Sequence, residues 1–204
     1  LYAAGDSACS GLNGAGTLPG NRLLDSLSGG NNAGTHAAEW VKSQPFANTE
    51  NLVLALQRCI DNHHITGDEE SAETVRRIGS IDSTLLDVAT KFTSSPNSAE
   101  ELAKYLEELS KTTELAQSIH LDQTSLIANT NFVAKTRIQA GIRLLTCSIR
   151  ASMARNESRG VHNRADFKDE NPELIHHITV DNEGNIGTLA VRKGQKDNWV
   201  LAPQ

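Results

Sequence analysis

The chain has 204 residues, of which 38% are hydrophobic and 22% are charged, a balance typical of a globular protein that buries a core without staples. Its formal net charge of −6 and its 19 scattered Lys and Arg residues argue against a nucleic-acid partner, because binding to a phosphate backbone needs clustered cations. The three cysteines form no paired motif, so we expect a reducing compartment and neither a disulfide framework nor a zinc site.

No stretch of the sequence resembles a membrane span or a targeting leader. The apolar runs fall short of the roughly 20 residues that cross a bilayer. A leader of charged, then apolar, then small residues is not found at the start. We therefore expect a cytoplasmic chain, peripheral at the inner face of a membrane if it meets one, and only indirectly through other subunits.

Glycine is concentrated at the start of the chain, in LYAAGDSACSGLNGAGTLPGNRLLDSLSGG. The first four residues fit the end of a strand, Gly5 and Asp6 a turn at its carboxyl end, and Asn21 the N-cap of a helix that begins at Arg22. Such a loop combines backbone amides, an acidic side chain and a helix N-terminus, which suits a ligand with hydroxyl groups and partial negative charge. The alternative is that these glycines only form surface turns.

Helical patterns occupy the middle of the chain, where apolar residues recur at intervals of three and four. The spacing predicts helices over residues 31–43, 48–62, 69–93, 98–120 and 122–155. Gly79 and Ser80 are a candidate break in the third helix, and Ser98 followed by Glu101 fits a capping box at the start of the fourth. Helices of this length, joined by short turns, predict an antiparallel bundle.

After Gly160 the pattern becomes that of a β-hairpin. Alternation over residues 175–180 predicts one strand, residues 181–185 supply turn-forming side chains, and residues 188–192 form the return strand. The predicted fold class is therefore mainly α, with a helical bundle and a C-terminal β-hairpin.

A second candidate site is the segment ARNESRGVHNRADF, residues 154–167. Its charged and titratable side chains are Arg155, Glu157, Arg159, His162, Arg164 and Asp166. Arginine can clamp a carboxylate through two parallel hydrogen bonds, so the segment could hold an acidic partner. The alternative, which spacing favours, is a salt-bridged loop that fixes the end of the preceding helix.

The remaining histidines do not indicate a metal site or a catalytic group. His63 and His64 are neighbours on a predicted helix end and cannot share one face of it. His36 and His120 have no partner by spacing. We assign no catalytic residue and no metal ligand.

The two segments, in this order, resemble the C-terminal half of the flavoprotein subunit of succinate dehydrogenases and fumarate reductases, a superfamily that includes L-aspartate oxidase. The first segment is similar to the family's stretch from a Gly-Glu or Gly-Asp pair to Gly-x-Asn-Ser-Leu-Leu-Asp. Residues 155–166 match the family's Arg-x-Glu-Ser-Arg-Gly-x-His-x-Arg-x-Asp, and residues 174–192 are similar to its C-terminal hairpin. The resemblance covers most of the chain.

The resemblance implies that the first segment binds FAD. The implied cofactor-binding residues are Gly5, Asp6, Asn21, Arg22 and Leu23. Asp6 would bind the ribityl chain, and the helix from Asn21 would point its N-terminus at the flavin ring and stabilise the reduced, anionic flavin.

Three positions depart from the family pattern. Thr17 stands where the family has the arginine that holds a substrate carboxylate, and Asn13 stands where it has a histidine. Arg22 replaces the family's serine at the helix start, so it is the candidate substrate-binding cation. These departures leave two alternatives open: a non-catalytic helical interaction module on the same scaffold, and an enzyme similar to L-aspartate oxidase.

The resemblance also implies three regions and a set of partners. Residues 1–44 would be the C-terminal remnant of an FAD-binding α/β domain, residues 45–160 the helical bundle domain, and residues 161–204 a C-terminal loop and hairpin extension. The implied enzyme transfers a hydride between a dicarboxylate and flavin. Its implied partners are an iron–sulfur subunit and the N-terminal part of the flavoprotein, which would precede residue 1. We expect this chain alone to be inactive, because one part cannot preorganise a site assembled from two.

Overall fold

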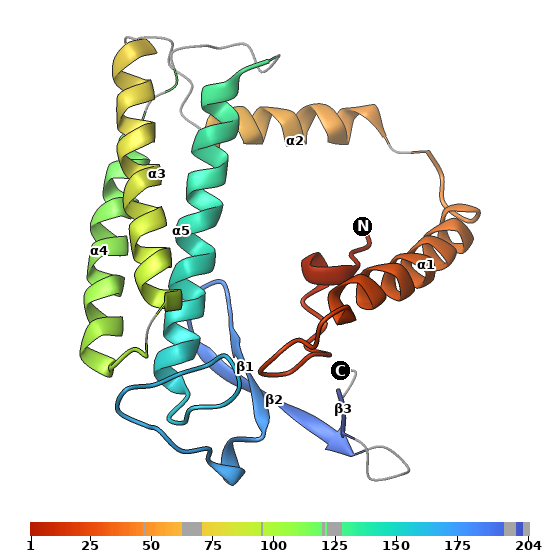
Figure 1. Cartoon of the computed structure of the whole chain (residues 1–204). Coiled ribbons are helices and arrows are strands. Elements are labelled where there is room, and N and C mark those ends of the chain that lie inside the picture. The colour runs from red at the N-terminus through yellow and green to blue at the C-terminus, as the bar shows by residue number, and fades with distance from the viewer. Residues whose placement is uncertain are drawn as a thin grey trace.

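The computed structural model describes residues 1–46, 48–62, 71–94, 96–119, 121, 128–193 and 199–201. The elements in chain order are η1 (Gly5–Ala8), α1 (Asn21–Val41), α2 (Thr49–Asn62), α3 (Ser71–Ser94), α4 (Ala99–Gln117), α5 (Thr130–Ala154), η2 (Pro172–Leu174), β1 (His176–Val180), β2 (Ile186–Lys193) and β3 (Trp199–Leu201). The fold is mainly α with an antiparallel sheet after the last helix, as the sequence predicts (Figure 1).

Helices α3, α4 and α5 form the antiparallel bundle. Each contacts the other two, and α4 runs opposite to its neighbours (Figure 1). Gly79 and Ser80 do not interrupt α3. The buried core consists of apolar side chains at helical spacing: Ile78, Ile81, Leu85, Val88, Leu102, Leu109, Ala116, Ile119, Ile138, Ile142 and Ile149. Burial of each large aliphatic side chain stabilises the fold by about 1.5–3 kcal/mol, so the bundle holds the hydrophobic core of the described chain.

The predicted capping box at the start of α4 is confirmed. The Ser98 hydroxyl accepts from the Glu101 backbone N–H at 3.3 Å, and the Ser98 backbone N–H donates to Glu101 Oε2 at 2.8 Å. These hydrogen bonds from Ser98 hold the pKa of Glu101 below its ordinary value. The helix therefore begins where its first orphan N–H groups find partners.

The N-terminal segment differs from the prediction in two ways. Its first four residues form no strand: Ala4 is extended (φ −144°, ψ 161°), but the described residues offer no neighbouring strand for it to pair with. The helix starts at Asn21 with Gly20 at the N-cap and continues to Val41, where a separate helix over residues 31–43 was expected.

The start of α5 is a second correction. The prediction began this helix at residue 122, but the helix starts at Thr130, and residues 122–127 lie outside the described residues. Asn129 is the N-cap, because its side-chain oxygen accepts from the Phe132 backbone N–H at 2.9 Å. Apolar periodicity extended the prediction past this cap, although Asn is among the strongest N-cap residues.

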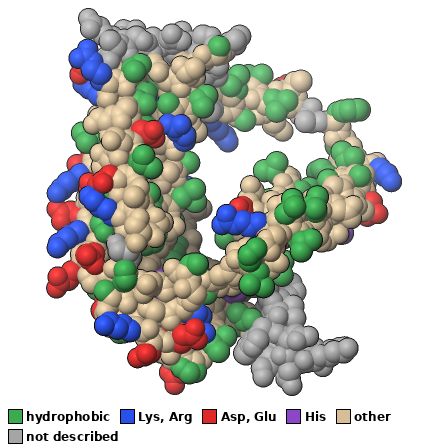
Figure 2. Space-filling view, viewed as in Figure 1, with side chains coloured by type: hydrophobic (Ala, Val, Ile, Leu, Met, Phe, Trp, Pro, Cys, Tyr) green, Lys and Arg blue, Asp and Glu red, His purple; other side chains and the backbone are tan. Residues whose placement is uncertain are grey.

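Helices α1 and α2 lie apart from the bundle. Among the described elements, α1 contacts only η1 and α2 contacts none (Figure 1). Their large exposed apolar side chains, which Figure 2 shows as green patches, are Leu23, Leu24, Leu27, Trp40 and Val41 on α1 and Leu52, Val53, Leu54 and Leu56 on α2. Apolar surface of this extent is typical of helices that pack against further protein. None of the described helices is both long and apolar enough to cross a membrane.

The predicted C-terminal hairpin is confirmed. Strands β1 and β2 pair in antiparallel register, with His177 opposite Leu189, and β3 adds a third strand that the sequence did not predict. The turn closes through the Asp181 N–H, which donates to the Asn185 carbonyl at 3.1 Å. Both β1 and β2 contact α5, so the hairpin packs on the end of the bundle.

Candidate functional site

The structure brings together the predicted residues of η1 and the start of α1. Gly5 is buried at φ +61°, and a Cβ there would lie 2.6 Å from Ser26 Oγ, so glycine allows η1 to approach α1. Asp6 follows it, and Arg22 Nε lies 3.9 Å from Asp6 Oδ1. Both side chains are more than 70% exposed, at 73% for Arg22 and 77% for Asp6. An acid and a cation therefore stand side by side on an open surface.

The N-terminus of α1 carries no side-chain cap. Gly20, the N-cap residue, has φ +86° and makes no side-chain hydrogen bond to the first turn. Asn21 is half-buried, and its Nδ2 donates to Asn13 Oδ1 at 3.4 Å. Leu23 is 66% exposed. The first N–H groups of a helix carry partial positive charge, so this end can accept an oxygen or ring nitrogen with partial negative charge.

The segment after α5 forms a salt-bridged loop around Glu157, as the sequence favours. The fully buried Glu157 carboxylate accepts from Arg155 Nη1 at 2.6 Å, Arg159 Nη2 at 2.9 Å and the Asn171 backbone N–H at 2.8 Å. Burial alone would raise the pKa of Glu157, but the hydrogen bonds from Arg159, Asn171 and Arg155 outweigh it and lower the pKa to about 2. The carboxylate therefore stays ionised and holds both arginines.

Arg164 forms the second part of this loop. It is 1% exposed and donates to both carboxylate oxygens of Asp166, at 2.8 and 2.7 Å. Its Nη1 also donates to the Ser152, Met153 and Arg155 carbonyls at the end of α5. The guanidinium thus caps the C-terminal end of α5, whose last carbonyls have no partner within the helix.

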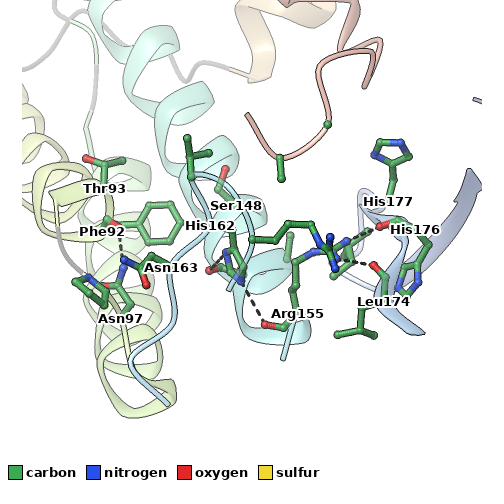
Figure 3. A pocket seen from close by; sticks show the side chains of 18 of the residues that line it. Phe92, Thr93, Asn97, Ser148, Arg155, His162, Asn163, Leu174, His176 and His177 are labelled. Atoms are coloured by element: carbon green, nitrogen blue, oxygen red, sulfur yellow. Dashed lines mark hydrogen bonds between the residues drawn. The ribbon is translucent and has the colours of Figure 1, made fainter. Parts of the chain in front are cut away.

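A cleft of about 740 Å³ opens between the bundle end, β1 and the N-terminal glycine loop (Figure 3). Arg155, His162, His176 and His177 contribute to its lining, and none of the described residues that line it is Asp or Glu. Burial lowers the pKa of His162, whose Nε2 lies 3.3 Å from the Arg155 carbonyl. The cleft therefore favours a neutral or anionic group over a cation.

The described residues contain no group of three or more His, Cys, Asp or Glu side chains that could hold a metal ion. His63, His64 and His120 lie outside the described residues. His36 is exposed on α1. The described residues at the start of α1 and around the cleft can bind a ligand through hydrogen bonds and charge interactions.

Residues 84–199, which are more than half of the chain, match the family model for the C-terminal part of the fumarate reductase flavoprotein. The chain belongs to this family. The fumarate reductase flavoprotein subunit of Mycobacterium tuberculosis (strain H37Rv) is 30% identical over 202 residues, which cover 94% of this chain and 33% of that protein. The succinate dehydrogenase flavoprotein subunit of Coxiella burnetii is 24% identical over 203 residues, or 96% of this chain and 33% of that protein.

Two solved structures share the fold of this family member. A quinol–fumarate reductase solved with menaquinol molecules superimposes with a TM-score of 0.76 at 22% identity, over 96% of this chain and 34% of that chain. A mutant of the Escherichia coli quinol fumarate reductase gives a TM-score of 0.70 at 23% identity, over 92% of this chain and 32% of that chain. The chain thus spans about a third of the length of the curated relatives it matches.

The two candidate segments of this flavoprotein C-terminal fold contact each other, which the sequence did not predict. The Val161 N–H donates to the Ala15 carbonyl at 2.8 Å, and both residues line the cleft. The Asn97 backbone bonds to Asn163 and Ala165, which brings the connection between α3 and α4 to the same place. The signal that could have pointed to a close contact is Gly160 in the middle of a charged motif.

Proposed function

We propose that this chain is the C-terminal part of an FAD-dependent oxidoreductase of the succinate dehydrogenase and fumarate reductase type. The observation that carries the proposal is the match to the fumarate reductase flavoprotein C-terminal family over residues 84–199. The 30% identity to the M. tuberculosis fumarate reductase flavoprotein subunit, along 94% of the chain, supports it. Bound FAD would supply hydride transfer to or from a dicarboxylate, with electrons exchanged through an iron–sulfur subunit.

The proposal includes a second part of the flavoprotein that completes the FAD-binding domain over residues 1–44. The exposed apolar side chains of α1 support it, because Leu23, Leu24 and Leu27 are each more than 60% exposed, at 66%, 64% and 63%. Gly30 and Gly34 add to this argument. Each costs about 1 kcal/mol relative to Ala in a helix interior, yet a Cβ at either position would meet nothing within 4 Å. Such glycines suit a helix that a further element approaches closely. In this proposal, partner subunits make any contact with the inner face of a membrane.

The groups at the start of α1 fit a flavin. Asp6 is an exposed carboxylate that can accept hydrogen bonds from the hydroxyls of a ribityl chain. The Asn21 N–H donates to the Leu18 carbonyl at 3.1 Å, so at the N-terminus formed by Asn21, Arg22 and Leu23 the next N–H groups and the partial positive charge of the helix end would face a flavin ring. Buried Gly5 packs against Ser26 of α1 and keeps Asp6 close to this helix end. These residues would orient the cofactor and stabilise negative charge on its reduced ring.

Arg22 is the proposed cation for a substrate carboxylate. Thr17, at the position of the family's arginine, offers a hydroxyl but no charge. The Arg22 guanidinium is 73% exposed, and its 3.9 Å approach to Asp6 is long for an ion pair. Exposed pairs of this kind contribute about 0–1 kcal/mol, so the side chain is available to turn toward a substrate.

The presence of Thr17 also favours a second candidate function, a helical interaction module that keeps the scaffold without dicarboxylate chemistry. The two candidates differ in how the flavin-loaded protein responds to succinate or fumarate. An enzyme of the proposed type changes its flavin absorbance spectrum when a dicarboxylate is added. An interaction module leaves that spectrum unchanged at every dicarboxylate concentration.

The flavin assignment is tested in the complete flavoprotein by replacing Asp6→Asn. We expect the dissociation constant for FAD to rise by about tenfold, because a charge-assisted hydrogen bond to a ribityl hydroxyl is lost. Glu39→Gln, which removes an exposed acid at the other end of α1, is the matched control and should leave FAD affinity unchanged. A complete protein that contains no flavin, or equal affinities for Asp6→Asn and Glu39→Gln, would contradict the assignment.

A further inference from the structure

We propose that Gly160 and Val161 are positioning residues that hold the glycine loop, defined here as residues 11–19, against the helical bundle. The Val161 N–H donates to the Ala15 carbonyl at 2.8 Å, so a backbone hydrogen bond joins two segments that lie far apart in the sequence. The importance of this contact for the flavin rests on the proposed function. The contact itself does not depend on it.

The turn that presents the Val161 N–H is fixed to the bundle. The Arg159 N–H donates to the His162 carbonyl at 2.8 Å, and the His162 N–H donates back to the Arg159 carbonyl at 3.0 Å. The Arg159 side chain is held by buried Glu157 at 2.9 Å. The His162 ring lies against the Arg155 carbonyl at the end of α5. These contacts fix the turn relative to α5, and the Val161 N–H points toward the glycine loop.

Glycine at position 160 meets two separate requirements. Its φ of +57° lies in the left-handed region, which costs most residues with a side chain roughly 1–2 kcal/mol. A Cβ at this position would also overlap the Ala15 carbonyl oxygen and lie 2.8 Å from its carbonyl carbon. The partner is backbone rather than a flexible side chain, so the loop itself would have to move. A side chain at position 160 therefore displaces the loop.

The held loop leads directly into the proposed flavin-binding end of α1. Asn13 and Thr17 lie on either side of Ala15, and Asn13 Oδ1 accepts from Asn21 Nδ2 at 3.4 Å. Ala15 and Val161 also line the same cleft. Through the hydrogen bond between Val161 and Ala15, the bundle would therefore fix the positions of Thr17 and of the start of α1. The C-terminal motif would then act on the cofactor site through the loop and without touching the cofactor.

The test compares two glycines that differ in surroundings but match in backbone conformation. Gly14, in the loop itself, has φ +55°, and a Cβ there would meet nothing within 4 Å. The variants Gly160→Asn and Gly14→Asn are made in the ¹⁵N-labelled 204-residue chain, because Asn tolerates positive φ and so isolates the collision from backbone strain. Amide hydrogen exchange is then measured residue by residue, with no flavin present.

In the unmodified chain we expect the Val161 amide to be protected. In Gly160→Asn its exchange should rise by about tenfold or more, together with that of the Gly14 and Gly16 amides, which donate within the loop, while the core amides of α4 and α5 keep their protection. Gly14→Asn should leave Val161 protected. Equal Val161 exchange in the two variants, or a rise that extends equally over α4 and α5, would overturn the proposal. Because hydrogen exchange is measured without flavin, its result does not depend on the flavin assignment, which the Asp6→Asn variant tests separately.

Discussion

Arg164 and Asp166 are joined by two parallel hydrogen bonds, Nε to Oδ1 at 2.8 Å and Nη2 to Oδ2 at 2.7 Å. The same pair connects two helices: Arg164 Nη1 caps the carbonyls at the end of α5, and Asp166 Oδ2 accepts from the Ala99 N–H at the start of α4, at 3.0 Å. The pair thus links the last turn of α5 to the first turn of α4.

The first prediction concerns Arg164→Lys, which keeps the charge but removes the planar fork. We expect the free energy of unfolding to fall by about 3 kcal/mol, because the ammonium cannot satisfy both Asp166 oxygens and the α5 carbonyls at once. Urea unfolding followed by circular dichroism measures this change. Arg137→Lys is the control: Arg137 is 66% exposed and pairs with Asp82, which is 49% exposed, so the substitution should cost less than about 0.5 kcal/mol. Similar losses in both variants would contradict the capping role.

The second prediction is a pH dependence that comes from Glu157. Its pKa in the folded chain is about 2, against an ordinary value of 4.5, so its ionised form stabilises the fold above its ordinary pKa. That contribution is lost as the pH falls from about 5 to about 2. In Glu157→Gln the free energy of unfolding should be about 2–3 kcal/mol lower at neutral pH, and the difference from the unmodified chain should narrow as the pH falls.

The matched control for this series is Glu170→Gln. Glu170 also pairs with Arg159, at 2.9 Å, but its side chain is 61% exposed. Its replacement should change the free energy of unfolding by less than about 1 kcal/mol. Urea unfolding at a series of pH values distinguishes Glu157→Gln from Glu170→Gln. A difference between Glu157→Gln and the unmodified chain that stays constant from about pH 5 to about pH 2 would refute the linkage.

The third prediction concerns the protonation of His162. Burial lowers its pKa, and the charges of Arg155 and Arg164 add to this and outweigh the hydrogen bond to the Arg155 carbonyl, which raises it, so the imidazole should titrate below its ordinary value of 6.5. The Arg155 carbonyl faces Nε2 at 3.3 Å and the Ser152 hydroxyl faces Nδ1 at 3.4 Å, which favours the tautomer with the proton on Nε2. Ser152→Ala should raise the midpoint toward 6.5, because a donor to the neutral ring is lost. An NMR titration of the ring protons measures both, and a midpoint above 6.5 in the unmodified chain would contradict the prediction.

Local signals in the sequence located most of the helical bundle and the hairpin. The capping box of Ser98 and Glu101 and the turn residues from Asp181 to Asn185 act within a few positions, so their outcome depends little on distant parts of the chain. The helix start at Asn129 is the exception: its side chain makes a local cap, but the apolar residues that precede it in the sequence predict an earlier start.

Features that depend on distant partners could not be predicted from local pattern. The strand expected over the first four residues needs a neighbour to bond with, and the described residues supply none. The contact between Ala15 and Val161 joins two segments whose spacing along the chain carries no information about distance in space. Family resemblance identified both segments, but only the folded structure brings them together.

The last prediction concerns the exposed face of α1. Leu27 is 63% exposed, so Leu27→Ser in this chain should change the free energy of unfolding by less than about 0.5 kcal/mol, whereas Leu109→Ser, at a position 1% exposed in the bundle core, should lower it by about 3 kcal/mol or more.

In the complete flavoprotein the effect of Leu27→Ser should be larger. If the rest of the FAD-binding domain covers α1, Leu27→Ser there removes a buried side chain and should lower the free energy of unfolding by about 2–5 kcal/mol. Urea unfolding of both variants in both proteins gives the four values needed. An effect of Leu27→Ser that is equally small in the complete flavoprotein would mean that this face of α1 stays open. The apolar surface of residues 1–44 would then need a different partner from the one proposed.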